Sequence, residues 1–429
     1  MSTGQRDGIG FLITGVLLIV LTVLFSEMGV VLRARFPSPY PSREVVISGP
    51  LVPEGPVESS PEILPPPEVI PSPRSFPLLQ APTVIAVDPL PLMAPADFSV
   101  PAALEEAVDF WRKIYAVYSS NQVVLHDTED LSIIYEVINL KDLDDFSEIE
   151  KEKRREMRVS AAILGLKGRL EDEAADRVRS QTGLKDKFTE AVRISGRYLP
   201  LFEEIFVSYG VPHEITRLVF VESMFQERAR SRVGAGGLWQ FLPGTARRFI
   251  KVDRWIDERY DPLVATHAAA RLLLKNREEV GSWPLAITSY NTGIGHVKRA
   301  VQSVGTTDIG SIVHRYRSDG FGFASRNFYP SFLAAYHVYE NRERYLGPIE
   351  RQPTLEFDQI PLPVSLTFTQ VAALSDCTLT EIQSLNPAYD RQVFLEEMRL
   401  PVGARIRLPK GRQAVFISRV SQIPLQEGA

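Results

Sequence analysis

The strongest constraint on the fold is a proline-rich segment that separates the N-terminus from the rest of the chain. Residues 36–101 hold 18 of the 32 prolines. Each proline fixes φ at about −65° and removes a backbone donor, so neither helix nor sheet can run through this segment. An extended polyproline-II spacer is expected, and at about 3.1 Å per residue it could reach on the order of 200 Å. A disordered tail without that role is the alternative.

An uncharged apolar run, Ile9–Phe25, precedes the spacer. At about 1.5 Å per residue, a helix of this length barely crosses a hydrocarbon core of about 30 Å. Residues 1–35 are therefore predicted to be an uncleaved signal anchor or transmembrane segment, followed by the Pro-rich linker 36–101. A cleaved signal peptide, whose apolar core is usually shorter, is the alternative.

Charge and cysteine content exclude several classes of function. The formal net charge is −5 and the basic residues are scattered, so no nucleic-acid partner is expected. Cys377 is the only cysteine, which excludes an intramolecular disulfide and a thiolate metal site. None of the six histidines forms an i, i+4 pair, so neither a metal site nor a cofactor is predicted.

Residues 102–200 are predicted to form a helical extension. Apolar residues in AALEEAVDFWRKIYAVYSS recur at helical spacing, and NQVVLHD after it reads as a short extended piece. Leu131–Leu199 is expected to be helix after helix, with EIEKEKRREMR as a solvated helix face. His126 beside Asp127 is interpreted as a hydrogen-bonded structural histidine rather than a catalytic one.

Glu222 lies in an apolar helical run that begins at Pro212. Ile215, Leu218, Glu222 and Phe225 share one face of the predicted helix. Burial of a carboxyl group on such a face raises its pKa and keeps it protonated, as general-acid chemistry requires. The alternative is a glutamate at the rim of the core, either extended toward solvent or paired with Arg217, Arg228 or Arg230.

A glycine-rich turn follows this helix. GAGG at 234–237 lets the chain pass close to a ligand, and it is followed by LWQF and by Pro243, which begins a new helix. Aromatic surface next to an amide is suited to gripping a sugar. Farther on, SWPLAITSYNTGIGH ends a helix with Tyr290 and Asn291 and breaks at Gly293.

The ordered motifs from Glu222 to Ala246, together with WPLAITSYNTG, resemble the lytic murein transglycosylases with an SLT-type, goose-lysozyme-like domain. The stretch ending in YGVP and the later DERYDP are similar to the membrane-bound D branch of that family. The resemblance covers roughly residues 105–345. It implies that Glu222 is the catalytic acid and that Trp239 is part of the groove wall. The substrate-binding residues that it implies are Ser223, Gln240, Tyr290, Asn291 and Tyr329.

One motif departs from the family pattern. Members often carry E-T-R-x-Y-V near the end of the domain, where this chain has ASRNFYP. Ala324 replaces the glutamate and Phe328 the tyrosine, so Tyr329 fills the role only if the local register differs.

The resemblance implies a reaction with a single carboxyl group. Glu227 is expected on the solvated side of the chain, so no second acid is assigned. Glu222 would protonate the oxygen between N-acetylmuramic acid and N-acetylglucosamine, and the muramyl C6 hydroxyl would close a 1,6-anhydro ring. Two alternatives remain: a goose-type muramidase that hydrolyses the same bond with water, and a non-catalytic wall-binding scaffold.

Residues 352–412 change character again. A short helix, a turn, a second helix ending in SLNP and a strand ending in IRLP resemble a degenerate LysM-type sugar-binding module. A purely structural appendage is the alternative. Cys377 is expected between the two helices as a small buried hydrophobe, and residues 413–429 are assigned to a tail.

The expected fold class is mainly α, with a lysozyme-like helical catalytic domain at 201–348, the N-terminal helical extension and the small α+β LysM-like module. The expected partners are peptidoglycan glycan strands and, through the N-terminal segment, a membrane. The chain is expected to be a monomer in the cell envelope, either anchored in the inner membrane or exported, with its catalytic domain in the periplasm.

Overall fold

The computed structural model describes residues 98–422. The predicted anchor, nearly all of the predicted Pro-rich linker and the end of the predicted tail lie outside the described residues. Within 98–422, no helix combines the length and the apolar character needed to cross a membrane.

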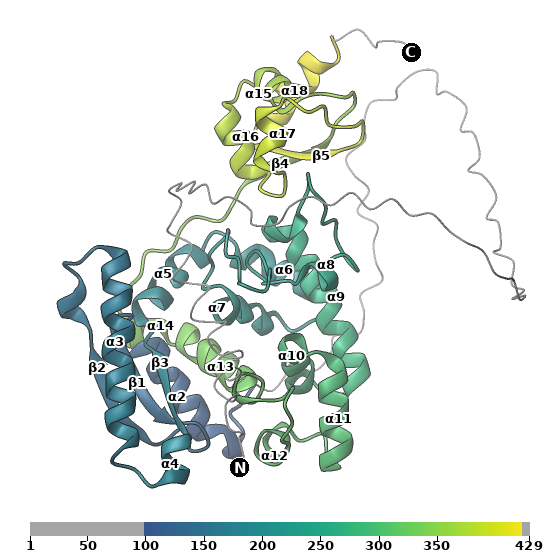
Figure 1. The fold of residues 1–429 in the computed structure, drawn as a ribbon. Coiled ribbons are helices and arrows are strands. Elements are labelled where there is room, and N and C mark those ends of the chain that lie inside the picture. Colours follow the sequence, from purple (N-terminus) through teal and green to yellow (C-terminus); the bar gives the residue numbers. More distant parts are fainter. Residues whose placement is uncertain (1–97, 423–429) are drawn as a thin grey trace, which may run out of the picture. The chain divides into compact units, whose positions relative to one another are not determined.

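The first part of the described chain is a mixed α/β segment, which corrects the expectation that Leu131–Leu199 is helix after helix (Figure 1). β1 is the predicted extended piece, but β2 and β3 fall inside the stretch expected to be helical. The elements are η1 (Ala102–Leu104), α2 (Glu105–Ala116), β1 (Gln122–Asp127), β2 (Ile134–Asn139), η2 (Lys141–Leu143), α3 (Glu148–Lys167), α4 (Asp172–Asp176), β3 (Val178–Thr182) and α5 (Lys185–Ser195).

β1 is the central strand of an antiparallel sheet with the order β2-β1-β3. α3 lies alongside this sheet, where Leu166 joins the strand residues Val123 and Leu125 in a small core (Figure 1). The side chain of Ser147 caps α3 by accepting from the backbone N–H of Glu150. The charged run at the start of α3 is mostly exposed, as predicted.

The second part is helical and carries the main core. Its elements are α6 (Leu199–Ser208), η3 (His213–Arg217), α7 (Leu218–Glu222), α8 (Pro243–Ala246), η4 (Glu258–Tyr260), α9 (Pro262–Val280), α10 (Trp283–Thr292), α11 (Ile294–Val304), α12 (Ile309–Arg315), α13 (Phe323–Glu340) and α14 (Arg342–Leu346). α13 packs against α2, α7 and α10, so it contacts both helices that end near the candidate site. Two predictions are confirmed here: a helix begins at Pro243, and the later helix breaks at Gly293.

The C-terminal module has its own core beneath a two-stranded antiparallel sheet. The predicted helix, turn, helix and strand are confirmed, while the first strand and two further helices were not predicted. Two of its helices begin with reciprocal capping boxes, Thr367 with Gln370 and Thr378 with Glu381. The elements are β4 (Phe357–Pro361), α15 (Phe368–Ser375), α16 (Leu379–Leu385), α17 (Arg391–Leu395), β5 (Arg405–Pro409) and α18 (Gln413–Val420).

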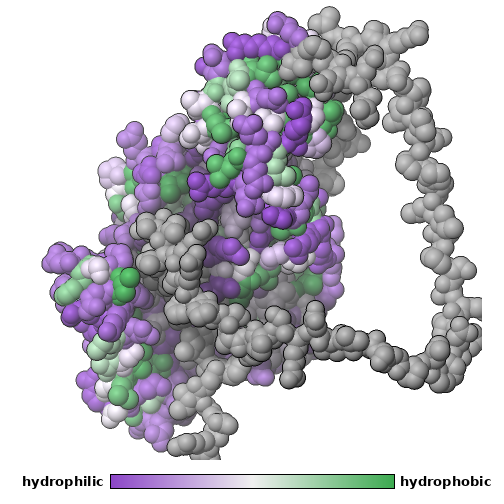
Figure 2. Space-filling view, turned by 45° about the horizontal axis from the view of Figure 1, so that its top comes forward, coloured by the Kyte–Doolittle hydropathy of each residue, from purple (hydrophilic) through white to green (hydrophobic). Residues whose placement is uncertain are grey.

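Side-chain and backbone contacts join this module to the segment before α9. Trp255 packs against the module's core. The backbone N–H of Asp257 donates to Ala388 O at 2.7 Å, and that of Asp390 donates to Trp255 O at 2.9 Å. The surface seen in Figure 2 is mostly hydrophilic, with hydrophobic side chains in small separate patches.

Three residues singled out in the sequence lie close to expectation. His126 is fully buried, with Nδ1 2.8 Å from the carbonyl oxygen of Asp127. Glu227 is exposed and accepts a hydrogen bond from the Tyr198 hydroxyl. Cys377 lies between α15 and α16 but is only partly buried, and its Sγ donates to Ser375 O.

Candidate active site

Glu222 is the last residue of α7, a helix of five residues. The preceding turn, η3, begins after Pro212 as predicted, but it is a 3₁₀-helix rather than the first turn of an α-helix. The predicted helical face is wrong beyond Glu222, because the chain leaves the helix at Ser223. Phe225 reaches the core by another backbone path.

That path runs through two residues whose backbone is in the left-handed conformation. Met224 has φ 49° and Phe225 φ 57°, and both side chains are buried. Non-glycine residues rarely adopt such angles, and where they do the strain concentrates at functional sites. The strained pair follows Glu222 after one residue, Ser223, so the carboxyl group stands at a sharp end of its helix.

The glycine-rich loop is fastened to the end of α7. Ser223 Oγ donates to Leu238 O at 2.8 Å, and the backbone N–H of Gly237 donates to Ala229 O at 2.9 Å. Gln240, itself at φ 46°, donates from Nε2 to Gly237 O at 2.8 Å and to Ala229 O at 3.2 Å. The Ser223 hydroxyl and the Gln240 amide nitrogen therefore hold the loop.

Gly237 cannot be another residue without movement of the backbone. Its φ is +75°, and a Cβ there would lie 1.8 Å from the carbonyl oxygen of Arg259. Arg259 is 7% exposed and braces the same loop, since its Nη1 donates to Gly234 O at 2.6 Å and to Phe241 O at 3.0 Å. Sequence reasoning did not identify this support, although the DERYDP signature contains it.

The rings of Trp239 and Tyr290 lie close together, with centroids 6.5 Å apart, and Tyr290 is near Glu222. Trp239 is fully buried, and its Nε1 donates to Thr266 Oγ1 at 2.8 Å. The Tyr290 hydroxyl donates to Trp239 O at 2.8 Å, which ties the end of α10 to the loop. Burial, and secondarily the nearby Glu222, raises the pKa of Tyr290 well above its usual value, so the phenol stays neutral.

The end of α10 also presents polar atoms that lack a hydrogen-bond partner within the described chain. Asn291 is exposed, and its side chain makes no hydrogen bond with any described residue. Thr292 Oγ1 is buried and likewise has no partner among residues 98–422. Thr292 was not predicted as a site residue, because a threonine before a glycine is common at helix ends.

Glu222 is closely surrounded by protein, while the residue keeps part of its surface accessible. Burial raises its pKa to about 8. The alternative of an arginine partner is wrong for Arg217, which is bound to Glu203 and Glu340. Arg228 donates to Pro387 O at 3.4 Å. Glu222 is thus predominantly a protonated acid at neutral pH.

Tyr329 lies elsewhere. It is 1% exposed on α13, and its ring stacks on Phe332 with centroids 6.0 Å apart. Phe328 beside it is equally buried. The structure therefore brings Glu222, Ser223, Gln240 and Tyr290 together, with Asn291 following Tyr290, and places Tyr329 in the core.

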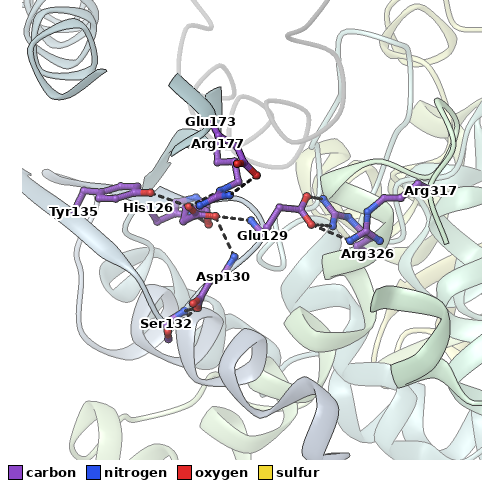
Figure 3. A network of polar contacts seen from close by, with 10 residues as sticks. His126, Glu129, Asp130, Ser132, Tyr135, Glu173, Arg177, Arg317 and Arg326 are labelled. Atoms are coloured by element: carbon purple, nitrogen blue, oxygen red, sulfur yellow. Dashed lines mark hydrogen bonds and ion pairs between the residues drawn. The ribbon is translucent and has the colours of Figure 1, made fainter. Parts of the chain in front are cut away.

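The start of α13, where the sequence departs from the family motif, takes part in an ion network (Figure 3). Arg326 donates to both carboxylate oxygens of Glu129, at 2.7 and 2.6 Å, and Arg317 donates to the same carboxylate at 2.8 Å. Glu129 lies in the loop between β1 and β2. A carboxylate from the N-terminal segment thus faces the arginine that stands two residues after Ala324.

The loop that carries Glu129 is itself braced by Asp127, which is fully buried. Its carboxylate accepts backbone N–H groups of Glu129 and Asp130 at 2.8 and 3.1 Å, and it binds the Tyr135 hydroxyl and Arg177 Nε at 2.7 and 2.9 Å. Burial alone would raise the pKa of Asp127, but these hydrogen bonds outweigh it and lower the pKa. Within residues 98–422, no group of three or more His, Cys, Asp or Glu side chains is arranged to hold a metal ion.

The helical part with the Glu222 site is similar to a known class of domain. Residues 202–313 match the transglycosylase SLT domain, and residues 356–424 match the LysM-like domain of lytic transglycosylase MltD. The chain is therefore similar to SLT-type transglycosylases over its helical part and to the LysM-like domain of lytic transglycosylase MltD over its C-terminal module.

Among named proteins, the chain is similar to membrane-bound lytic murein transglycosylase D of Escherichia coli strain K12, with 27% identity over 189 residues. The protein of the same name from E. coli O6:H1 strain CFT073 gives the same values. The match covers 41% of this chain and only 39% of each relative. An X-ray structure of lytic transglycosylase Slt from Pseudomonas aeruginosa, an inactive mutant, is 22% identical and covers 36% of this chain and 25% of that one. Its TM-score is 0.29, so the likeness carries no argument.

Proposed function

We propose that the protein is a peptidoglycan lytic transglycosylase that uses Glu222 as its single general acid and base. The observation that carries the proposal is the Glu222 carboxyl group, whose pKa is raised to about 8 by burial at the end of α7. Glycosidases with two carboxyl groups separate the acid from the nucleophile or base. Burial is the cause of the raised pKa, and no other charged group contributes to it. A reaction that needs only one carboxyl group suits this site.

In the proposed reaction, Glu222 protonates the glycosidic oxygen between N-acetylmuramic acid and N-acetylglucosamine. The bond from this oxygen to C1 of the muramyl ring breaks, and the C6 hydroxyl of the same ring attacks C1. The Glu222 carboxylate then accepts the proton of that hydroxyl. The products are a 1,6-anhydromuramyl end and a free hydroxyl on N-acetylglucosamine, and no water is consumed. A positioned acid and base contributes about 10²- to 10⁴-fold.

The other site residues are proposed to bind and orient the glycan. Asn291 offers an exposed amide, and Gln240 keeps its Oε1 available while its nitrogen holds the loop. Tyr290 contributes a neutral ring beside the acid. Ser223 acts mainly by fixing the loop. Tyr329 is 1% exposed, so it could contact the substrate only after a movement of α13.

The LysM-like domain and the named relatives extend the proposal. We infer that the module at 356–424 binds the glycan of the same polymer, as its resemblance to a LysM-type sugar-binding module implies. The curated relatives are called membrane-bound. The protein is therefore proposed to act in the cell envelope, held by its N-terminal segment.

The test is digestion of purified peptidoglycan sacculi, with the mass of the released muropeptides as the readout. The wild-type chain is expected to release anhydro products, which are lighter by one water than those of hydrolysis. Glu222→Gln is expected to keep the fold and bind sacculi but to lose cleavage by at least about 10²-fold. Glu227→Gln, at the exposed position five residues on, is the matched control and should cut normally.

Three results would count against the proposal. Products that carry an added water would identify a hydrolase, and the absence of any cleavage by the wild-type chain would favour a wall-binding scaffold. Near-normal cleavage by Glu222→Gln would show that another residue is the acid.

A further inference from the structure

A second candidate binding site lies in a pocket of about 640 Å³ that does not include Glu222. One wall comes from α6 and α9, and the other comes from β4, β5 and the loop after α16. Pockets of roughly 300 to 1,000 Å³ suit small ligands. This pocket is therefore large enough for a short peptide or a disaccharide.

A buried ion pair fixes the two walls. Arg407 Nη1 and Nη2 donate to the two oxygens of Asp261 at 2.7 and 3.0 Å, and both side chains are at most 10% exposed. Asn386 holds the backbone of Arg407 from both sides, with hydrogen bonds of 2.8 and 2.9 Å. The carboxylate of Asp261 also caps α9 by accepting from the backbone N–H groups of Leu263 and Val264. Both walls are thus pre-formed.

Two further arginines line the pocket without a carboxylate partner in the described part of the chain. Arg271 donates to the carbonyl oxygens of Phe249 and His267 at 2.8 and 3.3 Å, which orients its guanidinium without neutralising it. The side chain of Arg405 is exposed and makes no hydrogen bond or ion pair with any residue of 98–422. These two positive charges are available to a ligand.

Two carboxylates complement them. The carboxylate of Glu204 has no hydrogen bond or ion pair in the described structure, and that of Glu258 accepts the backbone N–H of Lys251 at 2.6 Å. Burial, with Arg271 a lesser cause, lowers the pKa of His267, so this lining histidine adds no charge at neutral pH. Apart from the Asp261–Arg407 pair, the pocket therefore presents two positive and two negative groups.

Apolar side chains line the pocket surface between the charged groups. Ile205, Phe249, Ile250 and Val264 line the pocket, and Tyr389 stands opposite on the module. An inorganic anion would meet two carboxylates here, and a neutral oligosaccharide would leave the charges of both signs without partners. A short peptide with both carboxylate and ammonium groups satisfies the charges and the apolar wall together.

We propose that this pocket binds the peptide stem of the wall polymer, a short zwitterionic peptide, at a site separate from the one that cleaves the glycan. The choice of this peptide rests on the proposed function. Arg271 and Arg405 would receive its carboxylates, while Glu204 and Glu258 would receive its ammonium group. The enzyme would then recognise peptide-bearing strands through the joint between its two domains.

The test is isothermal titration calorimetry of the full chain with the tripeptide L-alanyl-γ-D-glutamyl-meso-diaminopimelate. Saturable binding is expected, and the same tripeptide with amidated carboxylates should bind about tenfold more weakly. Arg405→Gln and Arg271→Gln should each weaken binding about tenfold. Arg391→Gln, at an exposed arginine of the same module outside the pocket, is the matched control and should bind normally.

The inference is overturned by the absence of saturable binding, by an equal loss in Arg391→Gln, or by unchanged binding in both pocket variants. It is also overturned if chitotetraose, a neutral saccharide, binds more tightly than the tripeptide and does so with Arg405-dependent affinity. Sacculus cleavage measured in parallel separates the two ideas. If the chain cleaves sacculi but does not bind the peptide, the peptide-site inference fails and the proposed function stands. If it binds the peptide but does not cleave sacculi, the proposed function fails and the peptide site stands.

Discussion

At the scale of the residue, the Glu222 carboxyl group couples activity to stability. Its folded-state pKa of about 8 lies above the value of 4.5 that it has when exposed. Between these values the unfolded chain is ionised at this position while the folded chain keeps its proton. The folded state binds more protons, so this group lowers the free energy of unfolding as the pH rises through that window. Above about pH 8 the loss is complete and constant.

Glu222→Gln is therefore expected to be more heat-stable than the wild-type chain, with a larger difference in melting temperature at pH 8 than at pH 4. Glutamine has nearly the same shape but no charge to desolvate. Scanning calorimetry at the two pH values measures the difference. Glu396→Gln, at an exposed position, should show no such trend. A melting-temperature gap of equal size at both pH values would mean that Glu222 is not desolvated.

Gly237→Ala is expected to lower the free energy of unfolding by more than about 2 kcal/mol, because backbone strain and a clash with Arg259 O act together. Gly234→Ala is the matched control, since Gly234 has φ +83° but open space around its Cα. Only the strain remains there, about 1 kcal/mol. Chemical denaturation of both variants measures the two losses, and similar losses would contradict the close approach.

The sequence predicts some features of the Glu222 site but not its backbone geometry. Helical periodicity was enough to place Glu222 toward the core, and the Gly-rich turn indicated a close approach of the backbone. The left-handed pair Met224 and Phe225 was not predictable, because side-chain pattern carries no information on such angles. Arg259 was missed for a related reason, since its role depends on which carbonyl oxygens the fold brings to it.

At the scale of the element, the loop between β1 and β2 links the N-terminal segment to α13. The side chain of Glu129 is 42% exposed and binds two arginines. The hydrogen bond from Arg326, ahead of the other causes, lowers the pKa of Glu129. The contribution of Glu129 to stability is thus present above its unfolded-state pKa and is lost as the pH falls through the lowered value.

Glu129→Gln is expected to cost on the order of 1 kcal/mol, because a partly exposed network contributes little more than that. Hydrogen exchange should accelerate in the β1–β2 loop and in the first turn of α13. Glu173→Gln is the control, since that side chain is 91% exposed and reaches Arg177 only at 3.4 Å. An unchanged exchange rate in α13 would show that the network does not brace this helix.

The elements also show where pattern reasoning fails. α2 and α10 were predicted because their apolar residues follow a helical period or because proline and glycine mark their ends. β2 and β3 were not, since their burial follows no alternation: both faces of β2 are largely accessible, and β3 is buried only at its end. Their strand state comes from pairing with β1, a contact between distant parts of the sequence.

At the scale of the whole molecule, the buried Asp261–Arg407 pair determines how firmly the two domains of the described chain are joined. Removing one partner from a buried pair leaves an uncompensated charge. Here the remaining carboxylate would still cap α9, so the variant is expected to fold.

Arg407→Met is expected to cost on the order of 3 kcal/mol, measured as a loss of hydrogen-exchange protection at the amides of Asp257 and Asp390. These amides donate across the joint. Arg412→Gln, which removes an exposed contact with Asp376 at 3.4 Å, is the control and should leave both amides protected. Full protection in Arg407→Met would show that the joint does not depend on the pair.

Trp255 has a practical consequence for anyone who divides this protein into fragments. Its position in the chain assigns it to the helical domain, but its ring completes the core of the C-terminal module. A recombinant fragment that stops before Phe357 would expose the Trp255 side chain to solvent. A fragment that starts at Phe357 would lack this side chain from its hydrophobic core. The first fragment would be prone to aggregate and the second would be less stable, so the two domains are best purified as a single polypeptide.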